Sequence, residues 1–139
     1  MCPLYRSHGS RPCNEPWCYG AAAEASIKKS IQLRKNLHPY IMSLTNNASA
    51  FGEPLMRPVW WDFPQDAAAL FFQEETTLML GPTYLAAPVL EPRATSRSLY
   101  LPRGASYTHY YSKKVYQGGE NVTVPAPVDE LPLFIVDRA

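Results

Sequence analysis

The sequence predicts an α+β chain in which a loop and a long helix precede an antiparallel β-sandwich. Apolar residues recur at steps of three and four between about residues 21 and 51, which is typical of an amphipathic helix. Short apolar runs separated by turn residues follow, and ten of the fourteen prolines lie after residue 53, as expected for strand ends and edges. With 139 residues, 46% of them hydrophobic, the chain is one ordinary domain long or two partial ones.

The first twenty residues predict a loop, because prolines and glycines interrupt them throughout. All three cysteines, Cys2, Cys13 and Cys18, lie here, and an odd and clustered set is a poor disulfide framework. Cys13 and Cys18 together with His8 suggest a metal site, but the Cys-x4-Cys spacing has no second pair to complete four ligands. We therefore predict small buried thiols, with no metal and no cofactor.

The helix predicted over residues 21–51 carries apolar residues on one side and mainly lysines on the other. Pro39 interrupts this pattern and is expected to kink or divide the helix near His38. Gly52, followed by Pro54, is expected to end it. Because a single amphipathic helix cannot bury its own apolar face, we expect its partner in an upstream segment. The apolar face comprises Ile27, Ile31, Leu37, Ile41, Leu44 and Ala48.

The apolar pattern shortens after the helix. Residues 55–61 are predicted to be extended, and a short helix is expected from Asp66 to Phe72, with Asp66 as its N-terminal cap. Glycines and prolines between the later apolar runs indicate the turns of an antiparallel β-sandwich. The expected strands cover residues 77–80, 84–90, 98–101, 107–111, 122–124 and 133–136.

The charged residues exclude some classes of partner. Thirteen basic and twelve acidic residues give a net charge of +1, and the densest basic runs are doublets. Binding to nucleic acid through phosphate neutralisation therefore has no basis in the sequence. No apolar run is long enough for a signal peptide or a membrane span, so we expect no membrane contact. The compartment in which the protein acts stays open.

Short motifs follow one another along essentially the whole chain. The first group comprises Arg6-Ser7-His8-Gly9, Glu15-Pro16-Trp17, Leu33-Arg34 and Leu37-His38-Pro39-Tyr40-Ile41. The second comprises Gly52-Glu53-Pro54-Leu55-Met56-Arg57-Pro58, Asp62-Phe63-Pro64, Leu78-Met79-Leu80-Gly81-Pro82, Ala87-Pro88-Val89, Tyr100-Leu101-Pro102 and Leu131-Pro132-Leu133-Phe134. Each string is weak alone, but in this order they resemble the C-terminal part of the α-glycosidases of glycoside hydrolase family 31.

The resemblance implies a division into two domains. In that family a (β/α)8 barrel is followed by a proximal C-terminal β-sandwich. Residues 1–52 would then be the C-terminal end of the catalytic barrel, namely its last loop and last helix, and residues 53–139 the sandwich. Arg6 and His8 would lie on the loop after the last barrel strand, at the end of the barrel where such enzymes have their active sites.

The resemblance also implies a reaction and roles for two residues. The family hydrolyses α-linked sugars with retention, which needs two carboxyl groups about 5 Å apart. Both family aspartates precede the Arg-x-His-Gly motif and would lie upstream of Met1, so this chain is assigned no catalytic residue. His8 would hydrogen-bond a hydroxyl of the bound sugar, and Arg6 would orient carboxylates around the site. The implied partners are an α-linked oligosaccharide or glycoside, from terminal α-glucosides or α-xylosides, and the missing N-terminal portion of the barrel.

Other residues are interpreted structurally. We expect Trp17 to pack against the loop, with contact to a sugar as the alternative. Trp60 and Trp61 are expected to pack in the core, although one of them could stack on a sugar. His38 is assigned a structural role, and His109 is expected inside the sandwich. Two further hypotheses stay open: a non-catalytic β-sandwich accessory module that binds carbohydrate or a partner chain, and a piece that complements a separately encoded barrel half.

Overall fold

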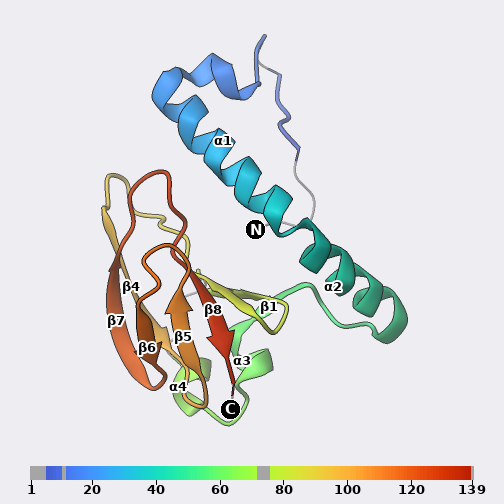
Figure 1. Ribbon diagram of the computed structural model, residues 1–139, viewed down its shortest axis with the longest axis vertical. Coiled ribbons are helices and arrows are strands. Elements are labelled where there is room, and N and C mark those ends of the chain that lie inside the picture. Colours follow the sequence, from blue (N-terminus) through green and yellow to red (C-terminus); the bar gives the residue numbers. More distant parts are fainter. Residues whose placement is uncertain (1–5, 11, 72–75, 139) are drawn as a thin grey trace. The chain divides into compact units, whose positions relative to one another are not determined.

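The computed structural model describes residues 6–10, 12–71 and 76–138. The chain forms two compact units, one comprising Met1–Leu55 with Val128–Glu130, the other Met56–Pro127 with Leu131–Ala139. Helices dominate the first unit and antiparallel strands the second (Figure 1). The predicted α+β fold class, a loop and helix followed by antiparallel sheets, is therefore confirmed.

The long helix is divided where the sequence predicts it. After a 3-10 turn, η1 (Pro16–Tyr19), come α1 (Ala21–Asn36) and α2 (His38–Phe51). Pro39 lies in the first turn of α2, where its missing N–H leaves no hydrogen bond unmade. Gly52 ends α2 in the left-handed conformation (φ 74°, ψ 14°), and its N–H donates to the carbonyl of Ala48 at 3.0 Å. Neither helix is long and apolar enough to cross a membrane, nor is any other within the described residues.

The apolar face of these helices is buried only in part. Leu37, Ile41 and Leu44 are buried, whereas α1 has no buried residue and Ile31 is 40% exposed. An amphipathic helix gains most of its stability from a packed apolar face. The sequence of α1 therefore carries an apolar face that the described residues of its own unit leave largely uncovered.

One short segment from far along the chain contacts α1. Lys29 Nζ lies 2.8 Å from Asp129 Oδ2 and 2.9 Å from Glu130 Oε1, and the Ser26 hydroxyl donates to the Val128 carbonyl at 3.0 Å. Hydrogen bonds to the two carboxylates raise the pKa of Lys29, and the bond from Lys29 lowers the pKa of Asp129. Exposed ion pairs stabilise little, so these contacts mainly fix where residues 128–130 lie on α1.

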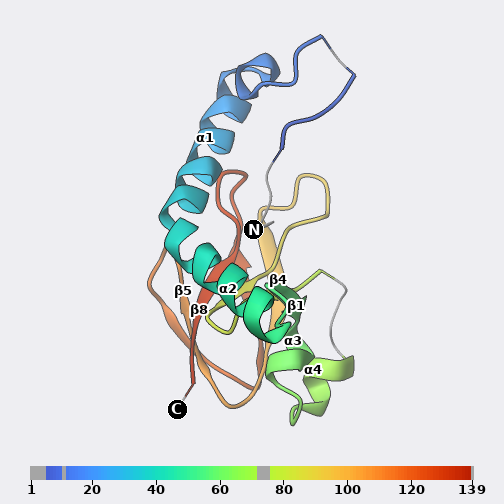
Figure 2. The same ribbon diagram turned by 90° about the vertical axis from the view of Figure 1, so that its right-hand side faces the viewer.

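Two antiparallel sheets form the second unit (Figure 2). The first has six strands in the order β1 (Met56–Pro58), β2 (Leu78–Leu80), β3 (Tyr84–Ala86), β8 (Leu133–Asp137), β5 (Ser106–His109) and β6 (Val115–Gln117). The second pairs β4 (Ser96–Leu101) with β7 (Glu120–Pro125). Two short helices, α3 (Val59–Asp62) and α4 (Ala67–Phe71), lie at one end of the sheets (Figures 1 and 2).

One hydrophobic cluster joins the two sheets. Leu85 and Phe134 from the six-stranded sheet, which are partners across β3 and β8, are fully buried with Leu101 and Val124 from β4 and β7. Side chains that meet between two sheet faces define a sandwich core. His109 is buried beside Phe134, as predicted, with ring centroids 5.3 Å apart.

The structure corrects two predictions near the start of this unit. Residues 59–61 are helical and not extended. Pro58 ends β1, and the single turn of α3 that follows redirects the chain so that Phe63 packs in the core. Trp60 and Trp61 consequently do not alternate across a strand, and they are 41% and 49% exposed instead of packed in the core. The predicted helix end at Phe72 lies outside the described residues.

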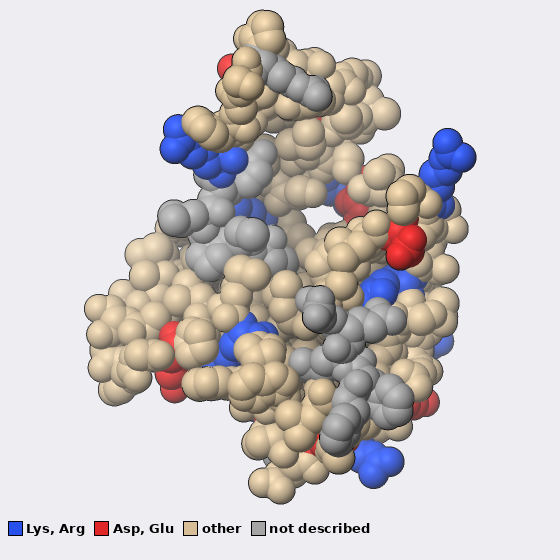
Figure 3. All heavy atoms as spheres, turned by 180° about the vertical axis from the view of Figure 1, so that it is seen from behind, with Lys and Arg blue, Asp and Glu red and all other residues tan. Residues whose placement is uncertain are grey.

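Charged side chains are spread over the surface. On the face shown in Figure 3, Lys and Arg side chains form separate small groups among uncharged residues. This distribution agrees with the doublets in the sequence and with the net charge of +1.

Candidate functional site

Arg6 and His8, the two predicted substrate-binding residues, lie on the irregular segment before η1, and both are exposed. One neighbour holds the chain on both sides of His8. The Ser7 hydroxyl donates to the Asn14 carbonyl, and Asn14 Nδ2 donates to the Gly9 carbonyl at 3.0 Å. A Cβ at position 9 would come within 2.8 Å of Asn14 Oδ1, so glycine permits this close approach. The His8 loop therefore has a defined attachment to Asn14.

The cysteines of this segment differ from the prediction. The sulfurs of Cys13 and Cys18 are joined as a disulfide, and both residues are half-buried, so the expectation of small buried thiols is wrong for this pair. The cause is local: the turn η1, opened by Pro16, reverses the chain and brings the two Cα atoms to 6.0 Å, within the range that a disulfide spans. Cys2 lies outside the described residues.

Glu15 lies between the two cysteines and faces both sulfurs. Its Oε2 is 3.1 Å from Cys13 Sγ and 3.7 Å from Cys18 Sγ, and it accepts the Asn14 N–H at 3.0 Å. The ligand atoms of Cys13, Glu15 and Cys18 lie within 4.8 Å of one another. Thiolates, and not disulfide sulfurs, are the metal ligands, so these residues could hold an ion only with the disulfide reduced.

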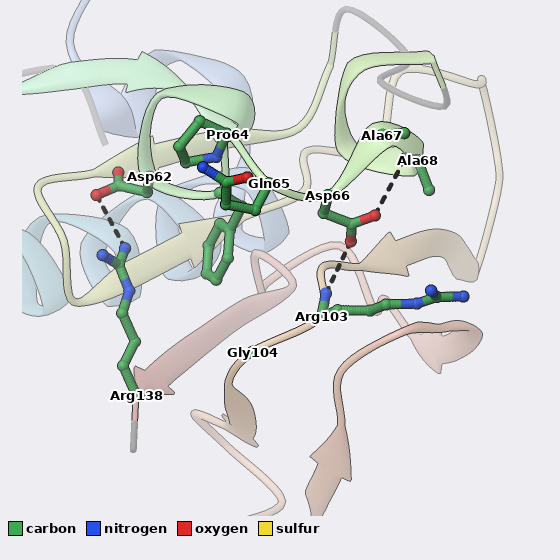
Figure 4. A pocket seen from close by; sticks show the side chains of 10 residues that line it. Asp62, Pro64, Gln65, Asp66, Ala67, Ala68, Arg103, Gly104 and Arg138 are labelled. Atoms are coloured by element: carbon green, nitrogen blue, oxygen red, sulfur yellow. Dashed lines mark hydrogen bonds and ion pairs between the residues drawn. The ribbon is translucent and has the colours of Figure 1, made fainter.

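A pocket of about 620 Å³ lies in the second unit, and neither Arg6 nor His8 lines it. It is bordered by the segment from α3 to α4, by the turn after β4 and by the C-terminal end of the chain (Figure 4). Its ionisable lining residues are Asp62, Asp66, Arg103 and Arg138. A pocket with two carboxylates is a natural place to look for acid–base chemistry, so the partners of each carboxylate decide its role.

Asp62 is fully engaged by two guanidinium groups. Arg57 donates from Nε to Oδ2 and from Nη2 to Oδ1, both at 2.7 Å, and Arg138 Nη2 lies 2.8 Å from Oδ1. The side chains of Arg57 and Asp62 are 6% and 4% exposed. Figure 4 shows the Arg138 side chain directed at Asp62. A carboxylate held in a bidentate pair has a structural role, because both of its oxygens accept hydrogen bonds. Neither oxygen of Asp62 is therefore available to attack a substrate as a nucleophile.

Asp66 caps α4, as the sequence predicts. Oδ1 accepts the N–H of Ala68 at 3.1 Å, while Oδ2 accepts the Tyr100 hydroxyl at 2.9 Å and the Arg103 N–H at 2.8 Å. Burial favours the neutral acid, but these three donors outweigh it and hold the pKa of Asp66 below its usual value. Burial, and then the bond to Asp66, raise the pKa of Tyr100. Asp66 is therefore an ionised acceptor and is unsuited to donate a proton.

Replacing Asp66 by asparagine should destabilise the second unit in a pH-dependent way. The amide cannot accept from all three donors, so we expect a loss of about 1–2 kcal/mol at pH 7. Because the folded-state pKa is lowered, the stabilisation by Asp66 is complete above the unfolded pKa of about 4 and is lost as pH falls through the folded value. Urea unfolding at pH 7, 5, 4 and 3 should show the two proteins converging. A difference that stays constant down to pH 3 would contradict this role.

Comparison with known families covers both units. The model described as "Glycosyl hydrolases family 31 TIM-barrel domain" matches residues 1–44, and "Glycosyl hydrolase family 31 C-terminal domain" matches residues 52–137. The barrel model matches the helical part of the chain, and the C-terminal model matches the part that forms the antiparallel sheets.

Individual relatives agree with the family models. Alpha-xylosidase A of Aspergillus niger is 34% identical over 95% of this chain, and alpha-glucosidase 2 of Bacillus thermoamyloliquefaciens is 34% identical over 96%. The crystal structure of an alpha-xylosidase from Xanthomonas citri superposes with a TM-score of 0.89, at 35% identity over 96% of this chain. The chain spans 21%, 17% and 15% of these relatives, so it corresponds to about a fifth of their length or less.

These relatives are glycosidases, and both parts of their shared C-terminal architecture are present here. The end of a TIM barrel and the domain that follows it account for the loop, the divided helix and the antiparallel sheets. This chain belongs to glycoside hydrolase family 31.

Proposed function

We propose that this chain is the C-terminal part of a retaining α-glycosidase that acts on terminal α-glucosides or α-xylosides. In this proposal residues 1–52 complete the catalytic barrel, and residues 53–139 form the proximal C-terminal sandwich. The chain supplies a loop that contacts the substrate, whereas the nucleophile and the acid/base come from the barrel portion that precedes this loop in the family.

The observation that carries the proposal is the collinear match of both family domains to a chain whose pocket carboxylates are already engaged. Retaining hydrolysis needs one carboxylate free to attack and one acid free to donate a proton. Asp62 is paired with Arg57 and Arg138, and Asp66 accepts three hydrogen bonds. The two carboxylates of this pocket are therefore unsuited to act as a catalytic pair, which supports the proposal that the pair lies elsewhere.

Arg6 and His8 are the residues we assign to the substrate side. Both are exposed on a loop that precedes η1 and α1, and in a barrel that loop would open at the end where substrates bind. A neutral imidazole offers one donor and one acceptor to sugar hydroxyls, and the guanidinium of Arg6 can orient neighbouring carboxylates. The uncovered apolar face of α1 gives the missing barrel portion a surface to pack on.

The purified chain alone should not hydrolyse 4-nitrophenyl α-glucoside or α-xyloside. Release of 4-nitrophenol should equal the rate in buffer, because positioning without the two carboxylates leaves the covalent step uncatalysed. The His8→Ala chain serves as the matched control and should give the same rate. Turnover that persists through purification and is lost in His8→Ala would contradict the proposal.

A free-standing accessory module is the alternative function. The exposed Trp60 and Trp61, with ring centroids 6.3 Å apart, are the feature of the second unit that favours it. Isothermal titration of the chain with isomaltose and with xylose-containing oligosaccharides separates the two. Saturable binding that disappears in Trp61→Ala would support the accessory module. The absence of binding would support the proposal that the chain is the C-terminal part of an α-glycosidase.

A further inference from the structure

The six residues from Cys13 to Cys18 form a small covalent ring next to the His8 loop. The turn η1 closes one side of the ring, with the Cys18 N–H donating to the Glu15 carbonyl at 3.0 Å, and the disulfide closes the other. Cys13 and Cys18 are both half-buried residues, so neither is sealed in a core away from a small thiol or disulfide reagent. The ring is thus both ordered and chemically accessible.

Asn14 links this ring to the loop. It is a ring member, and it holds the residues on both sides of His8 through the Ser7 hydroxyl and the Gly9 carbonyl. Its own N–H is fixed by the Glu15 carboxylate at 3.0 Å. Opening the ring would free the backbone on each side of Asn14, and with it the two hydrogen bonds that hold the His8 segment.

We propose that Cys13–Cys18 is a reversible disulfide that controls, through Asn14, how firmly the His8 loop is held. Asn14 is a positioning residue in this proposal. The redox partner is a low-molecular-weight disulfide such as oxidised glutathione. One cysteine thiolate attacks it, forms a mixed disulfide and releases one glutathione; the second cysteine then attacks the mixed disulfide and releases the other. Two thiols are oxidised to one disulfide, and one glutathione disulfide is reduced to two thiols.

The sequence allows the pairing to be mapped with one protease. Trypsin cleaves after Arg6 and after Lys28 but not at the Arg11–Pro12 bond, so Cys2 falls in peptide 1–6 and both other cysteines in peptide 7–28. After equilibration in a mixture of reduced and oxidised glutathione and alkylation, peptide 1–6 should carry one label or one glutathione. Peptide 7–28 should carry none and be lighter than its dithiol form by two hydrogens. Cross-linked 1–6 and 7–28 peptides, or two labels on 7–28, would overturn the pairing.

The effect on the loop is measured by ¹⁵N relaxation on the same chain. In the oxidised chain we expect order parameters near about 0.85 for Ser7–Gly9, falling below about 0.6 in Cys13→Ser/Cys18→Ser. Asn14→Ala should lower them in the oxidised chain although its disulfide is intact. Cys2→Ser should behave as the unchanged chain, and α2 should be unaffected throughout. Equal order parameters in oxidised and double-serine chains would overturn the link to His8.

Zinc titration separates the redox role from a metal site. The reduced chain should not bind Zn²⁺ tightly with one-to-one stoichiometry, because Cys13, Glu15 and Cys18 provide three ligands, one fewer than the closed set of a structural zinc site. Stoichiometric binding that is lost in the double-serine chain would overturn the proposal in favour of a metal site. None of these measurements uses a sugar, so they hold or fail independently of the proposed function. One further expectation does rest on the proposed function: reducing the disulfide in an active enzyme should raise the KM for the glycoside.

Discussion

Asp62→Ala should lower the free energy of unfolding of the second unit by about 3–5 kcal/mol, because it leaves a buried guanidinium without its partner. Arg57 is 6% exposed and directs two hydrogen bonds at Asp62, and Arg138 adds a third contact. For a unit of this size the change corresponds to a fall in Tm of roughly 12–40 °C. Urea unfolding followed by tryptophan fluorescence measures it, since Trp60 and Trp61 are neighbours of Asp62 in α3.

Two variants control for this effect. Glu120→Ala removes an exposed carboxylate from β7 and should change the stability by less than about 0.5 kcal/mol. Arg57→Met combined with Asp62→Leu removes both charges and should recover most of the loss, because the cost arises from an unpaired buried charge. If Asp62→Ala alone costs less than about 1 kcal/mol, the assignment of Asp62 as the buried structural partner of Arg57 and Arg138 is wrong.

Phe134→Ala should be comparably damaging, for a different reason. Phe134 is fully buried on β8, and its ring packs edge-on against His109 and Tyr116 at 5.3 and 6.0 Å between centroids. Removing the ring leaves a cavity that the two sheets can only partly close, so we expect a loss of about 3–5 kcal/mol in urea unfolding. Phe51→Ala makes the same truncation at a side chain that is 77% exposed, and should cost less than about 0.5 kcal/mol. Equal losses in the two variants would show that the described core is incorrect.

The division and the end of the long helix could be predicted from the sequence because both boundaries have a local physical cause. Pro39 can occupy a first turn but not a helix interior, and Gly52 can adopt the left-handed conformation that ends α2. Asp66 could be recognised as a cap for the same kind of reason. Residues 59–61 could not, because a helix of four residues is too short to show a period. The strand β6, which carries Val115, was missed because two of its three residues are exposed and show no apolar run.

The candidate site was only partly predictable. Arg6 and His8 came from the resemblance, and their contact with a sugar stays a prediction. The prediction of free thiols at Cys13 and Cys18 is wrong, because the odd number of cysteines in the sequence gives no sign that two of them pair. Only the turn at Pro16, seen in the structure, shows that their Cα atoms lie close together. The pairing of Arg57 and Arg138 with Asp62 joins β1 and the residue after β8 to α3, and no spacing in the sequence reveals this contact.

The most direct test of the central claim is the effect of His8→Ala in a complete barrel. The chain replaces the matching C-terminal segment of alpha-xylosidase A of Aspergillus niger, and hydrolysis of 4-nitrophenyl α-xyloside is measured on hybrids that are folded by circular dichroism. Loss of the hydrogen bond to the sugar should lower kcat/KM by about 100-fold, or roughly 2.7 kcal/mol. His38→Ala, at an exposed histidine that begins α2, should stay within about twofold. A folded, active hybrid in which His8→Ala is as active as His38→Ala would contradict the account.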